Sequence, residues 1–164
     1  MSILFKIKNI LVIDDESTVR ALLKEIIMDM NYGFFEAARA EKGLKILEKE
    51  EISLIMSSIF KWKDAWRSSD IDAYLAFYSK DFKRADKSGF ALFSEQKKSI
   101  FAKNEQKTIK LTNIDVSPYP NSIGKNMFKV LMDEEYLSPA VKFTGKKELF
   151  LEIADNQIKI LSED

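Results

Sequence analysis

Three long segments of alternating apolar and polar residues near the C-terminus most constrain the fold of this chain. They are "TIKLTNIDVSPY", "NMFKVLMDEEYLS" and "VKFTGKKELFLEIAD", and a shorter segment, "NQIKILSE", follows them. Successive side chains of a β-strand point to opposite faces of a sheet, so each segment predicts a strand with one apolar face. The apolar parity shifts between Leu111 and Ile114, which predicts a bulge at Thr112 or Asn113 that helps to curve the sheet.

Helical patterns precede these strands from Ser58 onward. In "SIFKWKDAWRSSD", Ile59, Trp62 and Trp66 recur at helical spacing, which predicts one amphipathic helix. Helices followed by long strands are typical of an α+β domain, so we expect a curved antiparallel sheet wrapped around a helix over residues 58–164.

Two further elements are expected between that helix and the strands. The segment "SSDIDAYLAFYSKDF" predicts a helix that is capped by Ser69 or Asp70 and carries Tyr74 and Tyr78 on one face. A short strand at 90–93 and a helix capped by Ser94 are expected to follow.

The first third of the chain instead alternates strand and helix patterns. "NILVID" is a continuous apolar run, typical of a strand buried on both faces of a parallel sheet. Ser17 is expected to cap a helix from Thr18 to about Met30, and a short strand near Phe34 follows. A second helix at 40–49 leads to "SLIMS", residues 53–57, which predicts a third strand. Residues 1–57 therefore predict a parallel β-α-β-α-β unit of the α/β class.

Composition excludes several kinds of chemistry. Lysine plus arginine and aspartate plus glutamate number 26 each, so no large basic field predicts a nucleic-acid partner. The chain has no cysteine and no histidine, which removes thiol catalysis and the commonest metal ligands, and we expect neither a metal nor a cofactor. No apolar run reaches the roughly 20 residues of a membrane helix. "MSILFKIKNILVIDDE" does not resemble a signal peptide, so we expect no membrane partner and a cytoplasmic location.

Strand parity identifies one polar misfit inside the expected sheet. Residues 128, 130, 132, 134 and 136 share a mostly apolar face, and among them Glu134 is the charged side chain. In the next strand Leu149 and Leu151 fix the inward parity, which also turns Lys147 inward. With a hairpin turn through 138–142, Glu134 and Lys147 are expected to lie opposite each other. The resulting candidate pocket residues are Trp62, Trp66, Tyr74, Tyr78, Met132, Glu134, Tyr136 and Lys147.

Residues 8–59 resemble the front half of a bacterial response-regulator receiver domain. Asp14 and Asp15 in "ILVIDDE" match the acidic pair that helps such domains to hold magnesium, and "SLIMSSI" matches the strand that ends in the phosphoacceptor aspartate. Here that position is Ser58, and the two later strands of a receiver are absent from the pattern. The resemblance therefore implies a degenerate, truncated receiver that is not phosphorylated, whose open sheet edge is expected to pair in a homodimer.

Residues 58–164 resemble nuclear transport factor 2-like domains, including those of L,D-transpeptidase-type cell-wall proteins. The resemblance rests on "WKDAWRSSDIDAYLAFYSKDF", "FKVLMDEEYLS" and "GKKELFLEIADNQIKILSE" in that order. It implies a cone-shaped sheet that encloses a pocket. We expect a non-catalytic module that binds a small polar molecule or a cell-wall fragment. The alternatives are a small isomerase or hydrolase that uses Glu134, a signalling protein regulated through its receiver part, and a decayed fusion.

Overall fold

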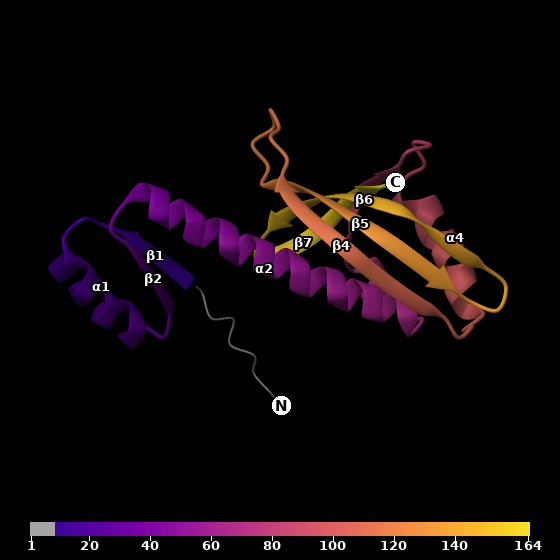
Figure 1. Cartoon of the computed structure of the whole chain (residues 1–164), viewed down its shortest axis with the longest axis horizontal. Coiled ribbons are helices and arrows are strands. Elements are labelled where there is room, and N and C mark those ends of the chain that lie inside the picture. The colour runs from indigo at the N-terminus through magenta and orange to yellow at the C-terminus, as the bar shows by residue number, and fades with distance from the viewer. Residues whose placement is uncertain (1–8) are drawn as a thin grey trace. The chain divides into compact units, whose positions relative to one another are not determined.

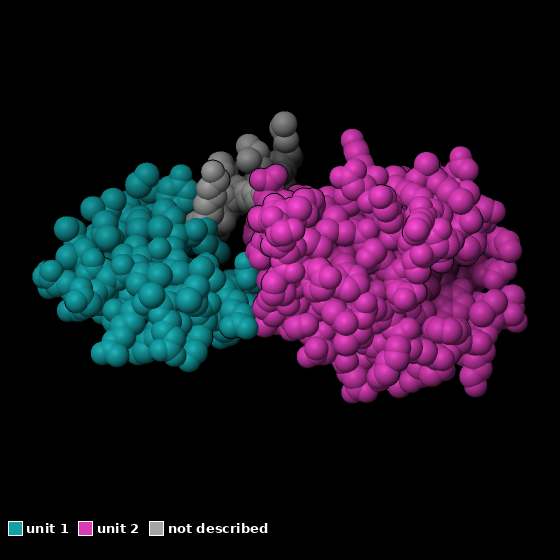
Figure 2. All heavy atoms as spheres, turned by 90° about the horizontal axis from the view of Figure 1, so that it is seen from above, with its two compact units in different colours: residues 1–51 teal, residues 52–164 magenta. Residues whose placement is uncertain are grey.

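The computed structural model describes residues 9–164, and the chain divides into two compact units with a boundary between Glu51 and Ile52 (coloured separately in Figure 2). The signal-peptide prediction rests partly on residues 1–8, which lie outside the described residues.

The first unit pairs two short parallel strands with one helix. Strand β1 (Asn9–Ile13) pairs in parallel with β2 (Gly33–Ala37), and helix α1 (Ser17–Asp29) connects them. Both strands and the helix agree with the sequence prediction. Glu16 occupies the N-cap position in place of Ser17, and its backbone N–H donates to Asp14 Oδ1 at 2.8 Å. The turn before α1 is therefore closed by an aspartate side chain.

The predicted third strand at 53–57 is wrong, because these residues lie inside helix α2 (Ala40–Arg67). A short apolar run such as "SLIM" cannot be assigned to a buried strand or a buried helix by periodicity alone. The wider window shows the helical period: Ile55, Ile59 and Trp62 are fully buried on one stripe of α2. The helix predicted at 40–49 thus continues for 28 residues in total.

This correction removes the structural basis of a phosphoacceptor site. Ser58 lies within α2, where it is 9% exposed, rather than at the end of a strand. Residues 9–51 contain a parallel sheet of two strands, β1 and β2. The regulated-signalling alternative therefore lacks the strand at 53–57 that was predicted to lead to Ser58.

The second unit is built on a five-stranded sheet that curves over the C-terminal half of α2 (Figure 1). The strand order is β3-β7-β6-β5-β4, and every pairing is antiparallel except β3 with β7. The curved antiparallel sheet of the α+β prediction is thus present, with β3 as an additional parallel edge. The strands are β3 (Tyr78–Arg84), β4 (Thr108–Pro118), β5 (Met127–Leu137), β6 (Lys142–Ala154) and β7 (Gln157–Glu163).

Two short helices complete this unit and differ in part from the prediction. Asp70 caps α3 (Ile71–Leu75) by accepting from the Ala73 backbone N–H at 3.0 Å, as predicted. Tyr78 is not on this helix but begins β3. The strand predicted at 90–93 and the cap at Ser94 are wrong, because α4 (Phe90–Ala102) begins directly after its N-cap residue, Gly89. No helix within residues 9–164 combines the length and apolar character needed to cross a membrane.

The predicted bulge in β4 is confirmed. The pairing of β4 with β5 shifts between Thr112 and Asp115, and Asn113 adopts a positive φ of 50° at this point. Asparagine tolerates this left-handed conformation better than most residues. Its side-chain amide also donates to Asp133 Oδ2 at 2.6 Å, so the bulge is tied to the neighbouring strand.

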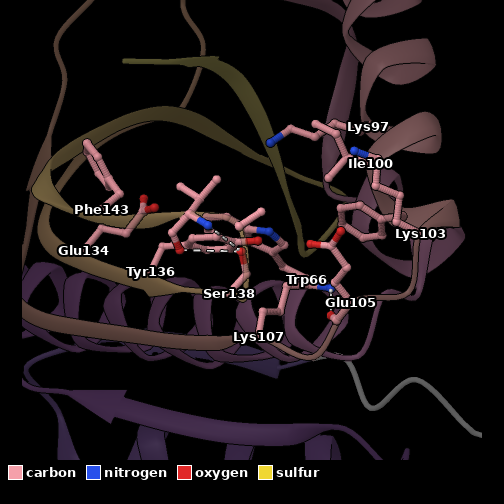
Figure 3. Close-up of a pocket in the computed structure, with 13 residues that line it drawn as sticks. Trp66, Lys97, Ile100, Lys103, Glu105, Lys107, Glu134, Tyr136, Ser138 and Phe143 are labelled. Atoms are coloured by element: carbon pink, nitrogen blue, oxygen red, sulfur yellow. Dashed lines mark hydrogen bonds between the residues drawn. The ribbon is translucent and has the colours of Figure 1, made fainter.

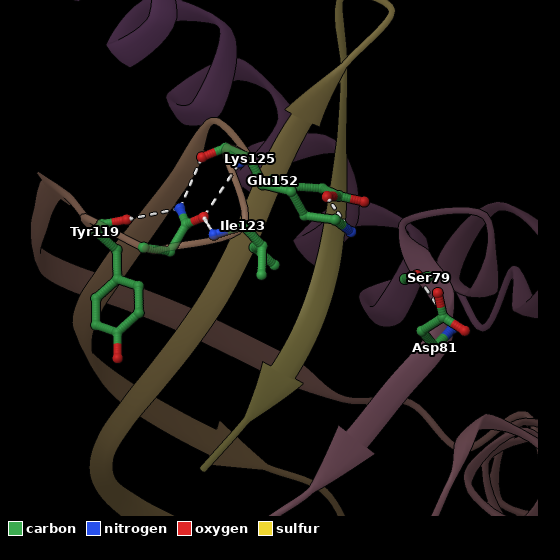
Figure 4. Close-up of polar contacts among 7 residues, drawn as sticks. Ser79, Asp81, Tyr119, Ile123, Lys125 and Glu152 are labelled. Carbon is green, nitrogen blue, oxygen red and sulfur yellow. Dashed lines mark hydrogen bonds and ion pairs between the residues drawn. The ribbon is translucent and has the colours of Figure 1, made fainter.

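The loop between β4 and β5 is organised by Asn121 (Figure 4). Its side-chain nitrogen donates to the carbonyl oxygens of Tyr119 and Lys125. Its side-chain oxygen accepts from the backbone N–H groups of Ile123 and Lys125. The Lys125 ammonium pairs with Glu152 Oε2 at 2.7 Å, which fastens the loop to β6. The β4–β5 loop is therefore held by its own hydrogen bonds and by an ion pair to β6.

Candidate functional site

A pocket of about 360 Å³ opens at the end of the second unit where the β5–β6 hairpin meets the end of α4 (Figure 3). Such a volume lies within the range of small-molecule sites. Its wall comes from α2, α4, the segment after α4, and the strands β5 and β6. The lining residues are Trp66, Lys97, Ile100, Phe101, Lys103, Glu105, Lys107, Glu134, Tyr136, Ser138, Ala140, Val141 and Phe143.

Aromatic rings form much of the pocket surface. Trp66 and Tyr136 are stacked, with ring centroids 5.6 Å apart and an interplanar angle of 21°. Phe143 lies on the same inward face of β6 as Gly145, and a Cβ at residue 145 would meet the Phe143 ring at 2.5 Å. Because glycine has no Cβ, the Phe143 ring can lie along the strand over residue 145. These surfaces can contact an apolar or planar ligand group.

Glu134 is the buried carboxylate of this wall. It points inward as strand parity predicts, and the residue is 6% exposed. In the observed register it lies opposite Gly145, whereas Lys147 lies opposite Met132, so Glu134 and Lys147 are diagonal neighbours rather than the direct pair that was expected. Their closest N–O distance is 3.9 Å. Burial raises the pKa of Glu134, and the lysines nearby offset only part of this effect.

Replacing Glu134 with glutamine is expected to raise the free energy of unfolding at neutral pH by roughly 1 kcal/mol, because burying a charge that has only a long contact with Lys147 costs free energy that a neutral amide does not. A raised folded-state pKa means that the native state binds more protons than the unfolded chain. The stability contributed by Glu134 therefore falls as pH rises from its ordinary pKa to its raised value. Urea unfolding at several pH values measures this. The exposed Glu135→Gln is the control, and a Glu134→Gln effect that does not vary with pH would contradict the prediction.

A hydrogen-bonded network of polar side chains lies deeper in the unit and contains Trp62, Tyr74, Tyr78 and Glu163. Tyr78 OH donates to Glu163 Oε2 at 2.9 Å and accepts from Trp62 Nε1 at 3.2 Å. Because its single proton is used, the 2.7 Å contact with Tyr74 OH has Tyr74 as the donor. Burial raises the pKa of both tyrosines well above the ordinary value, so both stay protonated donors. This network joins α2, α3, β3 and β7.

The residues predicted to line the pocket lie in three different places. Trp66, Glu134 and Tyr136 line the pocket. Lys147 lines a separate cavity of about 280 Å³, together with Glu163, to which its ammonium is 3.5 Å distant. The remaining four, Trp62, Tyr74, Tyr78 and Met132, are at most 4% exposed and lie in the hydrophobic core.

Lys97 is the main pocket residue that the sequence analysis did not identify. It projects from α4 toward the strands (Figure 3). The pattern contained a signal, because Phe93, Lys97 and Phe101 recur at intervals of four residues, and both phenylalanines are buried. The strand predicted at 90–93 concealed this stripe. Burial lowers the pKa of Lys97, since it removes water from the ammonium group.

The residues predicted to form a degenerate phosphorylation site belong to different units, Asp14 and Asp15 to the first and Ser58 to the second. Asp14 closes the turn before α1, and its carbonyl oxygen accepts from an Arg20 guanidinium N–H at 2.8 Å. Asp15 is exposed in the same turn, and Ser58 lies within α2. Within residues 9–164, no three carboxylate side chains gather in an arrangement that could hold a metal ion.

Sequence comparison identifies the family of the second unit. Residues 54–164 match the family described as the Cds6 C-terminal NTF2-like domain, where NTF2 denotes nuclear transport factor 2. The match covers most of the chain, and the chain belongs to this family. No significant match was found among curated proteins.

Solved structures agree with this assignment. A mutant of the helical cell shape determining protein Pgp2 from Campylobacter jejuni is 32% identical, with a TM-score of 0.68, 87% of this chain covered and 49% of that chain covered. Bd1075 from Bdellovibrio bacteriovorus is 18% identical, with a TM-score of 0.60 and coverages of 87% and 51%. The present chain thus spans about half of each protein. A putative dehydratase of the NTF2-like family from Streptomyces avermitilis shares the fold, with 14% identity, a TM-score of 0.61 and coverages of 71% and 94%.

Proposed function

We propose that the NTF2-like unit is a non-catalytic module that binds a small polar molecule or a cell-wall fragment in the pocket beside Glu134. One observation carries the proposal: the pocket is open, and it combines the stacked pair Trp66 and Tyr136 with charged side chains. Concave sites that join an apolar wall to a few polar groups are typical of ligand-binding sites. The similarity to a cell shape determining protein supports including cell-wall fragments among the ligands tested first.

A thermal-shift screen of the whole chain against muropeptides, amino sugars and small carboxylic acids tests this proposal. A ligand present at 100 times its dissociation constant is expected to add about 2.7 kcal/mol of stability. Tyr136→Leu removes the stacked ring from the pocket and is expected to abolish the shift. Tyr119→Leu, which removes a tyrosine ring from the β4–β5 loop, is the matched control. A screen without any shift, or a shift that Tyr136→Leu leaves unchanged, would contradict binding in this pocket.

The raised pKa of Glu134 favours a second candidate, a small isomerase or hydrolase in which this side chain transfers a proton. Turnover of a screened compound that Glu134→Gln abolishes would support this enzyme over a binding module. The homodimer, the absence of nucleic-acid and membrane partners, and the cytoplasmic location stay predictions.

A further inference from the structure

Lys97 presents a positive charge that forms no close ion pair with the described residues. Its Nζ lies 5.3 Å from the ring centroid of Phe93, 5.4 Å from that of Trp66 and 5.5 Å from that of Tyr74. Three rings thus fix the ammonium by cation–π contacts. Among residues 9–164, no carboxylate oxygen lies within 4.0 Å of this nitrogen, and no hydrogen bond reaches it. The three N–H donors of Lys97 are therefore left for water or a ligand in the pocket.

Glu134 presents a negative charge that is only weakly paired. Its side chain is 8% exposed, and the 3.9 Å distance to Lys147 Nζ is too long for a hydrogen bond. Lys147 lies closer to Glu163, at 3.5 Å. Within the described part of the chain, every side-chain nitrogen or oxygen that is sealed from solvent has a hydrogen-bond partner. The Glu134 oxygens therefore keep contact with the pocket, where they can accept a hydrogen bond.

We propose that this pocket binds a zwitterion, a free amino acid or a short unblocked peptide, whose carboxylate pairs with Lys97 and whose ammonium group pairs with Glu134. The two side chains reach the pocket from α4 and β5 and form no ion pair with each other (Figure 3). A ligand with both charges can therefore satisfy each one. The stacked pair Trp66 and Tyr136 then contacts the apolar part of the ligand. This inference rests on the proposed function and specifies its ligand class.

The arrangement of charges disfavours simpler ligands. A plain carboxylic acid would bring its negative charge into a pocket that also contains Glu134, and a plain amine would leave Lys97 unpaired. A polar group that is desolvated by a ligand but left without a partner costs binding affinity, and the cost is larger for a charge. A ligand that pairs with both Lys97 and Glu134 is therefore favoured over ligands that lack one of the two charges.

Blocked and unblocked dipeptides test the inference on the native chain. The probes are alanyl-phenylalanine in its L,L and D,D forms, each also as the N-acetyl and the C-amide derivative, titrated against the whole chain by calorimetry. We expect one unblocked form to bind, and each derivative to bind about tenfold or more weakly, because each loses one charge-assisted hydrogen bond. Equal binding of the unblocked and blocked peptides would overturn the inference.

Charge-removing variants assign each end of the ligand to a residue. Lys97→Met is expected to bind the free peptide and its amide equally, and Glu134→Gln is expected to bind the free peptide and its N-acetyl form equally. Lys98→Met and Glu135→Gln, at exposed neighbouring positions, serve as matched controls and are expected to bind like the native chain. If Lys97→Met still binds the free peptide more tightly than the C-amide derivative, the peptide carboxylate does not contact Lys97, and the inference is overturned.

Titrations of a neutral sugar and of a doubly blocked peptide separate this inference from the proposed function on which it rests. If a neutral sugar or a doubly blocked peptide binds, and Tyr136→Leu abolishes that binding, the proposed binding module is supported and the zwitterionic ligand class is overturned. Failure of every peptide, sugar and acid to bind would overturn both proposals.

The Lys97→Met variant is expected to fold. Because burial lowers the pKa of Lys97, its charged form is disfavoured in the folded protein, and Lys97→Met is expected to melt no lower than the native chain.

Discussion

Replacing Trp62 with alanine is expected to lower the free energy of unfolding by about 3–5 kcal/mol, the cost of emptying a large site in a packed core. Trp62 is fully buried at the centre of the second unit. Its ring stacks on Tyr74 at a centroid distance of 5.8 Å, and its Nε1–H donates to Tyr78 OH. Urea unfolding followed by far-ultraviolet circular dichroism measures the loss without relying on tryptophan fluorescence.

Two further variants separate the contributions of this tryptophan. Trp62→Phe keeps an aromatic ring but removes the hydrogen bond to Tyr78, and we expect a loss of about 1–3 kcal/mol. Phe60→Ala, at a position of the same helix that is 43% exposed, is expected to cost less than about 1.5 kcal/mol. A Trp62→Ala loss no greater than that of Phe60→Ala would show that α2 does not place Trp62 in the core.

Proline at residue 57 is expected to cost about 3 kcal/mol or more, because it removes a helical hydrogen bond and its ring clashes with the preceding turn. Ser57 lies in the interior of α2 with its side chain exposed, and its hydroxyl donates to the Leu54 carbonyl oxygen at 3.0 Å. A proline there interrupts the helix between Ile55 and Ile59, which anchor α2 in the core. Thermal and urea unfolding both report this loss.

Smaller substitutions at the same residue identify the element. In a helix, alanine is expected to be the most stable, with valine about 0.5 kcal/mol and glycine about 1 kcal/mol lower. In an exposed strand position, valine is favoured over alanine because β-branched side chains fit a pleated surface. A Ser57→Val variant more stable than Ser57→Ala would therefore restore the strand and contradict the helix.

The parts of the fold that were predictable have long, unambiguous patterns. The strands β4, β5 and β6 contain 11, 11 and 13 residues, enough for alternation to fix both the element and its inward face. The parity change at Leu111 and Ile114 likewise predicted the bulge. Short apolar runs failed at 53–57 and 90–93, where four or five residues fit either a strand or a helix. In both places the neighbouring helix includes the run.

The candidate site was predictable to the same extent. Glu134 was identified because its strand has a clear parity, and Trp66 because it belongs to a helical stripe. Lys97 was missed because its identification requires the start of α4, and because Phe93, Trp66 and Tyr74 come from three different helices. Contacts between distant segments have no signature in a local pattern.

The sequence by itself determined the α+β architecture of the second unit, the inward direction of Glu134 and the absence of cysteine and histidine chemistry. These follow from periodicity and composition, which local backbone geometry converts directly into structure. Tertiary structure alone decided that α2 is continuous, that Lys147 lies diagonal to Glu134, and that Lys97 lies among three aromatic rings. Register and side-chain neighbours depend on how separate elements pack, and the resulting burial shifts the pKa values of Glu134 and Lys97.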